Sequence, residues 1–215
     1  AQAPLGLESL PRPRQLPGLG THAMRSVGHV LRFHARRAVE NVKAPLWRAT
    51  WADMQRVCGG EDKFPSYPEF LGAATEIYRH LQGELLGAEN SRHLEDLVTE
   101  DLWPVVRATG ADFEKVRRRF GADECKINWA STDAFVCSLA PPEPADTGPA
   151  AASAEKGQQF VIAGARFFSV MSMSFAPDQV QHSIDDVIFR SPWDPVQGVQ
   201  QWKIAYIGGP VAPTE

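Results

Sequence analysis

The sequence predicts an α+β protein in which the helices come first and an antiparallel sheet follows. Apolar residues recur at helical spacing up to about residue 120, whereas later segments are short and rich in β-branched and aromatic residues. Because these later segments follow one another without helices between them, they favour antiparallel pairing. A proline-rich start followed by a basic stretch predicts an N-terminal arm outside this domain.

The first 63 residues divide into an arm and a basic helix with a linker. Residues 1–20 hold four prolines and three glycines, so we expect an extended arm there. Residues 21–63 are expected to contain an amphipathic helix over residues 22–43, which Pro45 ends, and then a linker. The apolar face of this helix is expected to comprise Met24, Val27, Val30, Leu31, Ala35, Ala38 and Val42.

Residues 64–215 are expected to form the folded domain. Ser66 and Glu69 have the spacing of a capping box, which predicts the start of a helix, and Gly87 is its expected stop. This helix is expected to bury a stripe of Phe70, Leu71, Ala74, Ile77, Tyr78, Leu81 and Leu85. Shorter helices are expected at residues 91–98, 99–106 and 112–120.

Four later segments have the composition of strands. They are residues 126–139, 159–175, 182–190 and 201–207. Residues 140–158 are rich in proline and alanine, and we expect a flexible, solvated loop there. Trp202, Ile204 and Tyr206 share one strand face because side chains alternate, so we interpret Trp202 as a core residue rather than a ligand contact.

The charge of the chain is uneven, and this constrains its partners. Residues 1–56 carry a net charge of +6 and residues 57–215 a net charge of −10. An acidic body disfavours RNA, because phosphate binding depends on lysine and arginine. Three cysteines without a C-x-x-C pair fit a reducing compartment rather than a disulfide framework. No apolar run approaches the roughly 20 residues that span a bilayer.

Two stretches carry a resemblance to a known family. Residues 70–106 include LEDLVTE at positions 94–100, and residues 186–210 include VIFR and WKIAYI. They resemble the matrix-adaptor (subunit 44-like) domain of the mitochondrial inner-membrane protein translocase, a family that includes a mitochondrial large-ribosomal-subunit protein. The resemblance implies a cystatin-like or nuclear-transport-factor-like cone, with helices packed on a curved antiparallel sheet. It also implies a location in the mitochondrial matrix, peripheral to the inner membrane.

No pattern in the sequence predicts catalysis, a cofactor or a metal. Tyr78, His93, Asp101 and Asp133 are the candidates for acid–base chemistry in a cone-shaped domain, but no spacing rule connects them. Asp185 and Asp186 point to opposite strand faces, so we interpret them as a charge pair at a strand edge. The histidines and cysteines show no zinc spacing and no H-E-x-x-H motif. We therefore expect no catalytic, cofactor-binding or metal-binding residues.

The basic segment is the main candidate for binding. Contacts with a partner or membrane are expected through Arg25, Arg32, Arg36, Arg37, Trp47 and Trp51. Its composition also fits a retained import signal, but docking on a protein subunit or on anionic lipid is favoured over RNA. A second basic cluster, Arg117, Arg118 and Arg119, is a candidate phosphate contact. The favoured interpretation of that cluster is a helix C-terminus whose cations offset the helix dipole.

Taken together, these features predict a non-catalytic structural or adaptor subunit of a large mitochondrial assembly, resembling a mitoribosome or translocase adaptor. Two alternatives stay open. One is an accessory subunit of a respiratory-chain complex or of ATP synthase, which the acidic body and the proline-rich arm favour. The other is an enzyme of the same cone fold, which rests on analogy between folds alone.

Overall fold

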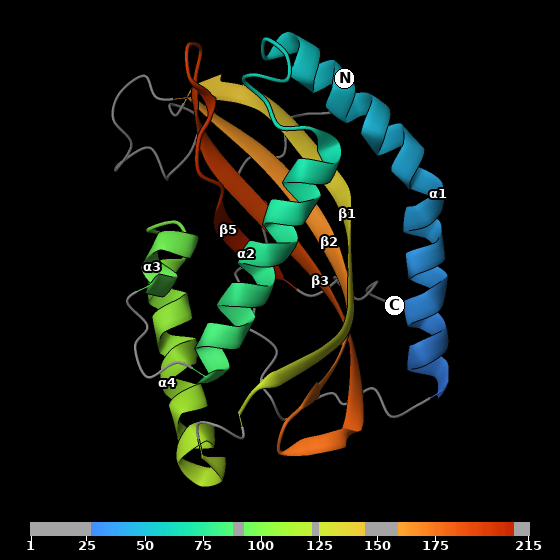
Figure 1. Cartoon of the computed structure of the whole chain (residues 1–215), viewed down its shortest axis with the longest axis vertical. Coiled ribbons are helices and arrows are strands. Elements are labelled where there is room, and N and C mark those ends of the chain that lie inside the picture. Colours follow the sequence, from blue (N-terminus) through green and yellow to red (C-terminus); the bar gives the residue numbers. More distant parts are fainter. Residues whose placement is uncertain (1–26, 88–92, 122–124, 145–158, 209–215) are drawn as a thin grey trace, which may run out of the picture.

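The computed structural model describes residues 27–87, 93–121, 125–144 and 159–208. These residues form an α+β structure in which a curled antiparallel sheet has helices on both faces (Figure 1). The α+β prediction is therefore confirmed. The arm over residues 1–20 lies outside the described residues.

The sheet is built mainly from three long strands in the order β1–β2–β3. They are β1 (Ile127–Pro144), β2 (Gln159–Met173) and β3 (Ala176–Asp194). The far edge of β3 is paired by two short strands, β4 (Gly198–Val199) and β5 (Lys203–Gly208). All of these pairings are antiparallel, as the order of the segments in the sequence predicts.

The strands differ from their predicted bounds: β3 extends beyond the predicted residues 182–190 at both ends, and β4 was not predicted. β1 continues to Pro144, so the first five residues of the predicted loop at 140–158 are strand, and that part of the prediction is wrong. Glu143 and Pro144 still pair with β2 after a register shift. Proline is tolerated there because β1 is an edge strand, where a missing N–H need not break the ladder. The remainder, residues 145–158, lies outside the described residues.

Of the helices in the domain, α2 follows its sequence signals closely, whereas α3 and α4 differ from the predicted bounds. α2 (Tyr67–Gly87) starts after Ser66, whose backbone N–H donates to a Glu69 carboxylate oxygen at 2.8 Å, as the capping box predicts. α3 (Leu94–Leu97) is short. α4 (Trp103–Phe120) is one continuous helix rather than the two predicted, and the N–H of Gly121 closes its end on the Arg117 carbonyl.

The longest helix, α1 (Val27–Val57), contradicts the prediction that Pro45 ends it. The helix continues through Pro45 for three more turns, over residues that were expected to be a linker. Proline removes one intrahelical hydrogen bond, and tertiary contacts on both sides of it can outweigh that cost. Figure 1 shows α1 curving around the outside of the sheet.

The two faces of the sheet meet different helices. Phe167 on β2 stacks on Tyr78 of α2 with ring centroids 4.3 Å apart, whereas the next residue, Phe168, packs against Phe33 of α1 at 5.4 Å. We call these the α2 face and the α1 face. The α2 face carries the main core, which also contains Trp202 at 7% exposure, so its interpretation as a core residue is confirmed.

Candidate functional site: helix α1 and its two sides

One side of α1 is occupied by the sheet. At 3.6 residues per turn, positions 33, 37, 40, 44, 47 and 51 lie along a single side. Phe33 is 1% exposed and packs edge-to-face against Phe168 and against His182 of β3. This small apolar cluster, completed by Ile184 and Phe135, holds the N-terminal half of the helix.

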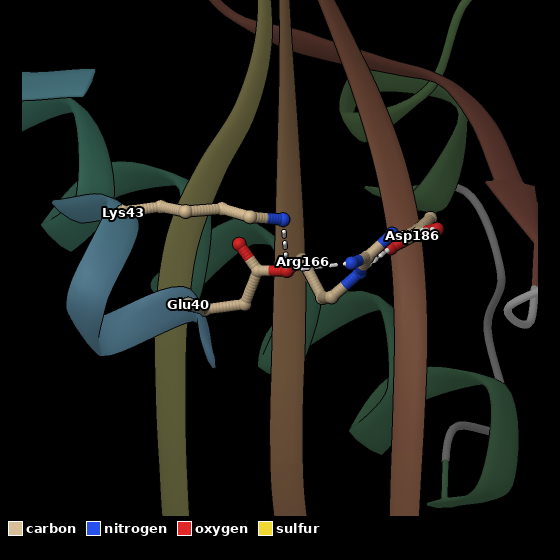
Figure 2. Close-up of polar contacts among 4 residues, drawn as sticks. All are labelled: Glu40, Lys43, Arg166 and Asp186. Carbon is tan, nitrogen blue, oxygen red and sulfur yellow. Dashed lines mark hydrogen bonds and ion pairs between the residues drawn. The ribbon is translucent and has the colours of Figure 1, made fainter. Parts of the chain in front are cut away.

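An ionic clasp, formed by Glu40, Arg166 and Asp186, fixes the middle of α1 (Figure 2). Arg166 donates from Nη1 to Glu40 Oε1 at 2.7 Å, and from Nε and Nη2 to both Asp186 oxygens at 2.6 and 2.9 Å. Lys43 lies at the solvent side, 3.5 Å from Glu40. Because two basic groups balance two acidic groups, Glu40 can be buried at 3% exposure on the surface of a sheet.

The electrostatics of the clasp favour its charged form. The hydrogen bonds from Arg166 to Asp186 raise the pKa of the guanidinium against the opposing effect of burial. Burial, with Asp186 nearby, raises the pKa of the neighbouring Cys137 thiol to about 12. A thiol in that state is neutral at physiological pH and is a poor nucleophile. The ionic clasp joins α1 to β2 and β3.

The C-terminal half of α1 is joined to the main core through Trp51. This ring is 1% exposed and stacks on Phe70 of α2 at 4.6 Å, and its Nε1–H donates to the Pro65 carbonyl at 2.8 Å. Trp47 is half-buried and packs against the same core. Both tryptophans were expected to contact a partner or membrane, but the structure places the Trp51 ring inside the protein.

The opposite side of α1 carries a row of exposed apolar side chains, which we call the solvent stripe. Leu31, Val42 and Leu46 are 64%, 82% and 68% exposed. Their spacing of eleven and four residues places them on one side, turned away from Phe33 and Glu40. Val39 and Val57, both exposed, continue the row along the helix. Single exposed apolar residues are ordinary, but a row along one helix is a candidate interaction surface.

Basic side chains flank this stripe, and the structure separates them into free and engaged groups. Among the described residues, Arg32 and Arg36 make no ion pair or hydrogen bond with the rest of the chain. Arg37 is engaged, since its Nη2 lies 2.8 Å from Asp133 on β1. Arg25 lies outside the described residues. Two of the four predicted arginines are therefore placed beside the stripe and available to a partner.

The candidate catalytic residues do not converge. Tyr78 donates from its hydroxyl to Asp185 at 2.7 Å, and both side chains are buried in the main core, whereas Asp133 lies on the α1 face. His93 and Asp101 are exposed. Asp185 and Asp186 do point to opposite faces, as predicted. They are not at an edge of the sheet, however, because β3 lies between β2 and β5.

Arg117 and Arg118, two members of the second basic cluster, make contacts within the fold. Arg117 donates from Nη1 to the Leu85 carbonyl at 2.8 Å, tying α4 to the end of α2. Arg118 contacts Glu114 one turn earlier at 2.6 Å. These contacts agree with the interpretation of a helix C-terminus. A phosphate contact at Arg117, Arg118 and Arg119 stays a prediction.

Within the described ranges, no three histidine, cysteine or acidic side chains gather closely enough to hold a metal ion. Among the helices in the same ranges, none has the length and apolar character needed to cross a bilayer.

Neither the known protein-family models nor the curated proteins give a match to this chain.

The ionic clasp is the part of the site that sequence reasoning missed. Its members come from α1, β2 and β3, and no local spacing connects them. A signal was nevertheless present, since Arg166 interrupts an otherwise apolar strand and Glu40 is the single acid in the basic segment of residues 22–43. Isolated charges in such settings are rarely buried unless they are paired.

Proposed function

We propose that the protein is a non-catalytic adaptor subunit that binds a larger assembly through the solvent stripe of α1. The observation that carries the proposal is the two-sided character of this helix. One side is fastened to the sheet by the clasp and by Phe33, while the other leaves Leu31, Val42 and Leu46 in solvent. A rigidly mounted helix with an unused apolar side is a preformed docking element, which lowers the entropic cost of binding.

The chemistry of the stripe indicates the kind of partner. Apolar side chains along the row and the free Arg32 and Arg36 beside it fit either an acidic, apolar protein surface or an anionic membrane. We favour a protein subunit, because the stripe contains no large aromatic anchor of the kind that interfacial membrane helices use. An RNA partner is disfavoured by the net charge of −10 on residues 57–215.

The setting proposed for this adaptor is the mitochondrial matrix, peripheral to the inner membrane. This part of the proposal comes from the resemblance of residues 70–106 and 186–210 to the translocase-adaptor family. The same resemblance supplies the proposed finer fold, a cystatin-like or nuclear-transport-factor-like cone. The curled antiparallel sheet with α2 packed on one face is compatible with it. The assembly would be mitoribosome-like or translocase-like, with a respiratory complex or ATP synthase as the alternative.

The non-catalytic part of the proposal is supported by the state of the polar core. Tyr78 and Asp185 are 0% and 3% exposed and satisfy each other by a hydrogen bond. A catalytic pair needs contact with substrate, and these side chains are enclosed by the aromatic core. A structural role for the pair is the simpler account.

The experiment that tests the proposal compares two sets of exposed apolar residues. Leu31→Gln, Val42→Gln and Leu46→Gln together should shift the tagged protein from fast-sedimenting assemblies to the slow fractions of a gradient of solubilised mitochondria. Val180→Gln with Val196→Gln is the matched control, since these valines are exposed elsewhere on the surface. Their replacement should leave sedimentation unchanged.

The molecules that are recovered together with the protein identify the assembly. Co-sedimentation with ribosomal RNA, lost after nuclease treatment, would support the ribosomal version, and recovery with an oxidoreductase or ATPase would support the alternative. Recovery of the wild-type protein only as a free monomer would contradict the adaptor proposal. Equal sedimentation of the stripe variant and wild type would contradict the role of α1.

A further inference from the structure

The N-terminal half of α1 is fastened to the sheet by a contact that contains two histidines. The Phe33 ring lies edge-to-face against the rings of His34 and His182, with centroids 5.3 and 5.0 Å away. The two imidazole rings lie 6.3 Å apart, one on the helix and one on β3. We call Phe33, His34 and His182 the histidine contact. Histidine is the side chain whose charge ordinarily changes between about pH 5 and 8, so this joint holds two groups that can respond to pH.

The packing of His182 disfavours its charged form. Its Nδ1 atom is buried and has no hydrogen-bond partner among the described residues, and the same holds for Nδ1 of His29, one turn before Phe33. A charged imidazole carries a proton on both nitrogens, so protonation leaves a buried N–H of His182 without an acceptor. Burial, and after it the neighbouring His34, lower the pKa of His182 below its ordinary value. The closed contact therefore favours neutral rings.

The charged groups around the histidine contact do not compensate a proton there. On β1, Asp133 faces α1 and is already paired with Arg37 at 2.8 Å. On β2 and β3, the described positions on the same face beside His182 are apolar: Phe168, Val170, Val180 and Ile184.

The acids further along the same face are distant or engaged. Asp178 and Asp186 lie four residues before and after His182 on β3, which is about 13 Å along a strand and beyond the range of unscreened attraction. Asp186 is also bound to Arg166, as is Glu40. Arg32 and Arg36 on α1 add positive charge. Protonation of both histidines therefore places new positive charge where no described acid is free to receive it.

We propose that the histidine contact is a pH-sensitive switch, which opens on protonation of His34 and His182 and releases residues 27–39 of α1 from the sheet. The closed state holds His182 neutral, whereas the open state admits water to the ring and binds protons more readily. The contact is therefore at full strength above about pH 6.5 and weakens as pH falls below that value. The rest of α1 stays attached, because Glu40 is held by Arg166 and Trp51 is 1% exposed in the main core.

Opening of the histidine contact changes the surface that α1 presents. Leu31 belongs to the solvent stripe and lies on the turns that are released, whereas Val42 and Leu46 lie beyond Glu40 on the part that stays attached. A partner that contacts the whole stripe therefore binds the closed form, and its affinity falls in acid. This consequence rests on the adaptor function proposed above, whereas the switch itself does not.

The test is amide hydrogen exchange on the intact chain at pH 7.5 and pH 5.5, with each rate corrected for the intrinsic effect of pH. Protection of the α1 amides before Glu40, relative to those of α2, should fall at least about threefold at the lower pH. His34→Gln combined with His182→Phe keeps an aromatic ring against Phe33 and removes both titrating groups, so its relative protection should not change with pH. The matched control is His80→Gln with His93→Gln, at two exposed histidines outside the contact, which should behave like wild type. Equal relative protection of wild type at both pH values, or a pH dependence that persists in the His34 and His182 variant, overturns the proposal.

A second measurement leaves the protein unaltered and so avoids any effect of substitution on folding. In an NMR titration of wild type, the carbon-bound ring protons of His182 should change their chemical shifts over the same pH range as the α1 amides around Phe33. Titration of His182 without a change in those amides overturns the switch.

The exchange and NMR measurements need no partner, which separates them from the test of the adaptor function. Sedimentation of wild type with its assembly should be lost at pH 5.5 and retained by the His34 and His182 variant. If wild type sediments equally at both pH values while α1 loses protection, the switch stands and its control of docking is overturned.

Discussion

The two faces of the sheet are held to their helices by different physics. On the α2 face, rings and aliphatic side chains that are fully buried surround one hydrogen-bonded polar pair, Tyr78 and Asp185. On the α1 face, the contact consists of a small cluster around Phe33 and the ionic clasp of Arg166 with Glu40 and Asp186. One interface depends mainly on apolar burial, and the other depends on charges as well.

This difference indicates how the parts of the molecule can be separated. Apolar burial contributes in proportion to area and is insensitive to salt, whereas a partly exposed ion network weakens when one member is removed or screened. The N-terminal half of α1 should therefore be the first part of the molecule to loosen, while Trp51 keeps its other half in the core.

The largest loss of stability is expected when one of two adjacent phenylalanines on β2 is replaced. Both Phe167 and Phe168 are 0% exposed, but they point to the α2 face and the α1 face respectively. Replacing Phe167 with alanine should lower the free energy of unfolding by about 3–5 kcal/mol, because it empties the centre of the main core. Phe168→Ala should cost less, near the lower end of that range, because its cluster is smaller. Denaturant unfolding compares the two.

Hydrogen exchange gives the same pair a second readout. Phe168→Ala should speed amide exchange in α1 around Phe33 and leave α2 protected, whereas Phe167→Ala should speed exchange throughout the domain. Equal losses of stability with the same exchange pattern would show that the two faces form one cooperative unit, contrary to the comparison.

A smaller effect is expected from opening the clasp. Arg166→Met leaves the carboxylates of Glu40 and Asp186 without their main partner and should cost about 2–3 kcal/mol. This is below the value for a fully buried pair, because the Arg166 side chain is 26% exposed and Lys43 remains near Glu40. Urea unfolding at low and high salt measures both the loss and its screening.

The matched variant for the clasp removes all three charges. Arg166→Met combined with Glu40→Gln and Asp186→Asn should recover most of the stability, because the one charge left without its partner, Lys43, is half-exposed. A triple variant that is less stable than Arg166→Met alone would mean that Arg166 acts through packing rather than through its ion pairs.

The smallest expected effect on the free energy of unfolding depends on pH. It concerns Tyr78 and Asp185, the polar pair of the main core. Burial raises the pKa of the Asp185 carboxyl above its ordinary value of 3.8, and the hydrogen bond from Tyr78 lowers it only in part. Above about pH 4 the unfolded chain therefore releases this proton first, so the contribution of Asp185 to stability falls as pH rises to the raised pKa. Asp185→Asn keeps an acceptor for Tyr78 and removes this dependence.

Unfolding free energies measured at pH 4, 5.5 and 7 test whether the contribution of Asp185 to stability falls as pH rises. The stability of Asp185→Asn relative to wild type should increase with pH and then level off. Asp178→Asn, at an exposed acid on the same strand, is the control for the substitution itself. A relative stability of Asp185→Asn that falls with pH would show that the ionised carboxylate is favoured in the folded protein.

Much of the local structure was predictable from the sequence because its causes are local. Ser66 and Glu69 predicted the start of α2 from a reciprocal hydrogen bond, and Gly87 its end. The β-branched and aromatic composition of the later segments predicted the strands, and the alternation of side chains placed Trp202 in the core. The predicted end of a helix was wrong where a tertiary contact outweighs a local signal. At Pro45 the helix continues toward the buried Trp51.

The site was less predictable, because periodicity shows which residues share a side but not what that side meets. α1 has apolar residues on two sides, and the sequence pattern grouped Leu31, Ala35, Ala38 and Val42 without Phe33. In the structure the side with Phe33 and Glu40 meets the sheet, and Leu31 and Val42 face solvent. The larger ring and the pairing of Glu40 with Arg166 decide this orientation.

The sequence alone thus determined the class of the fold, the capped helix α2, the strand order along the chain and the opposite directions of Asp185 and Asp186. Tertiary structure decided which charges meet, since Glu40, Arg166 and Asp186 come from three elements and only the folding of the sheet brings them together. It also decided where the last strand pairs, because β5 returns to β3 rather than to β1. Local interactions set the elements, and long-range burial and charge pairing set what each surface is free to bind.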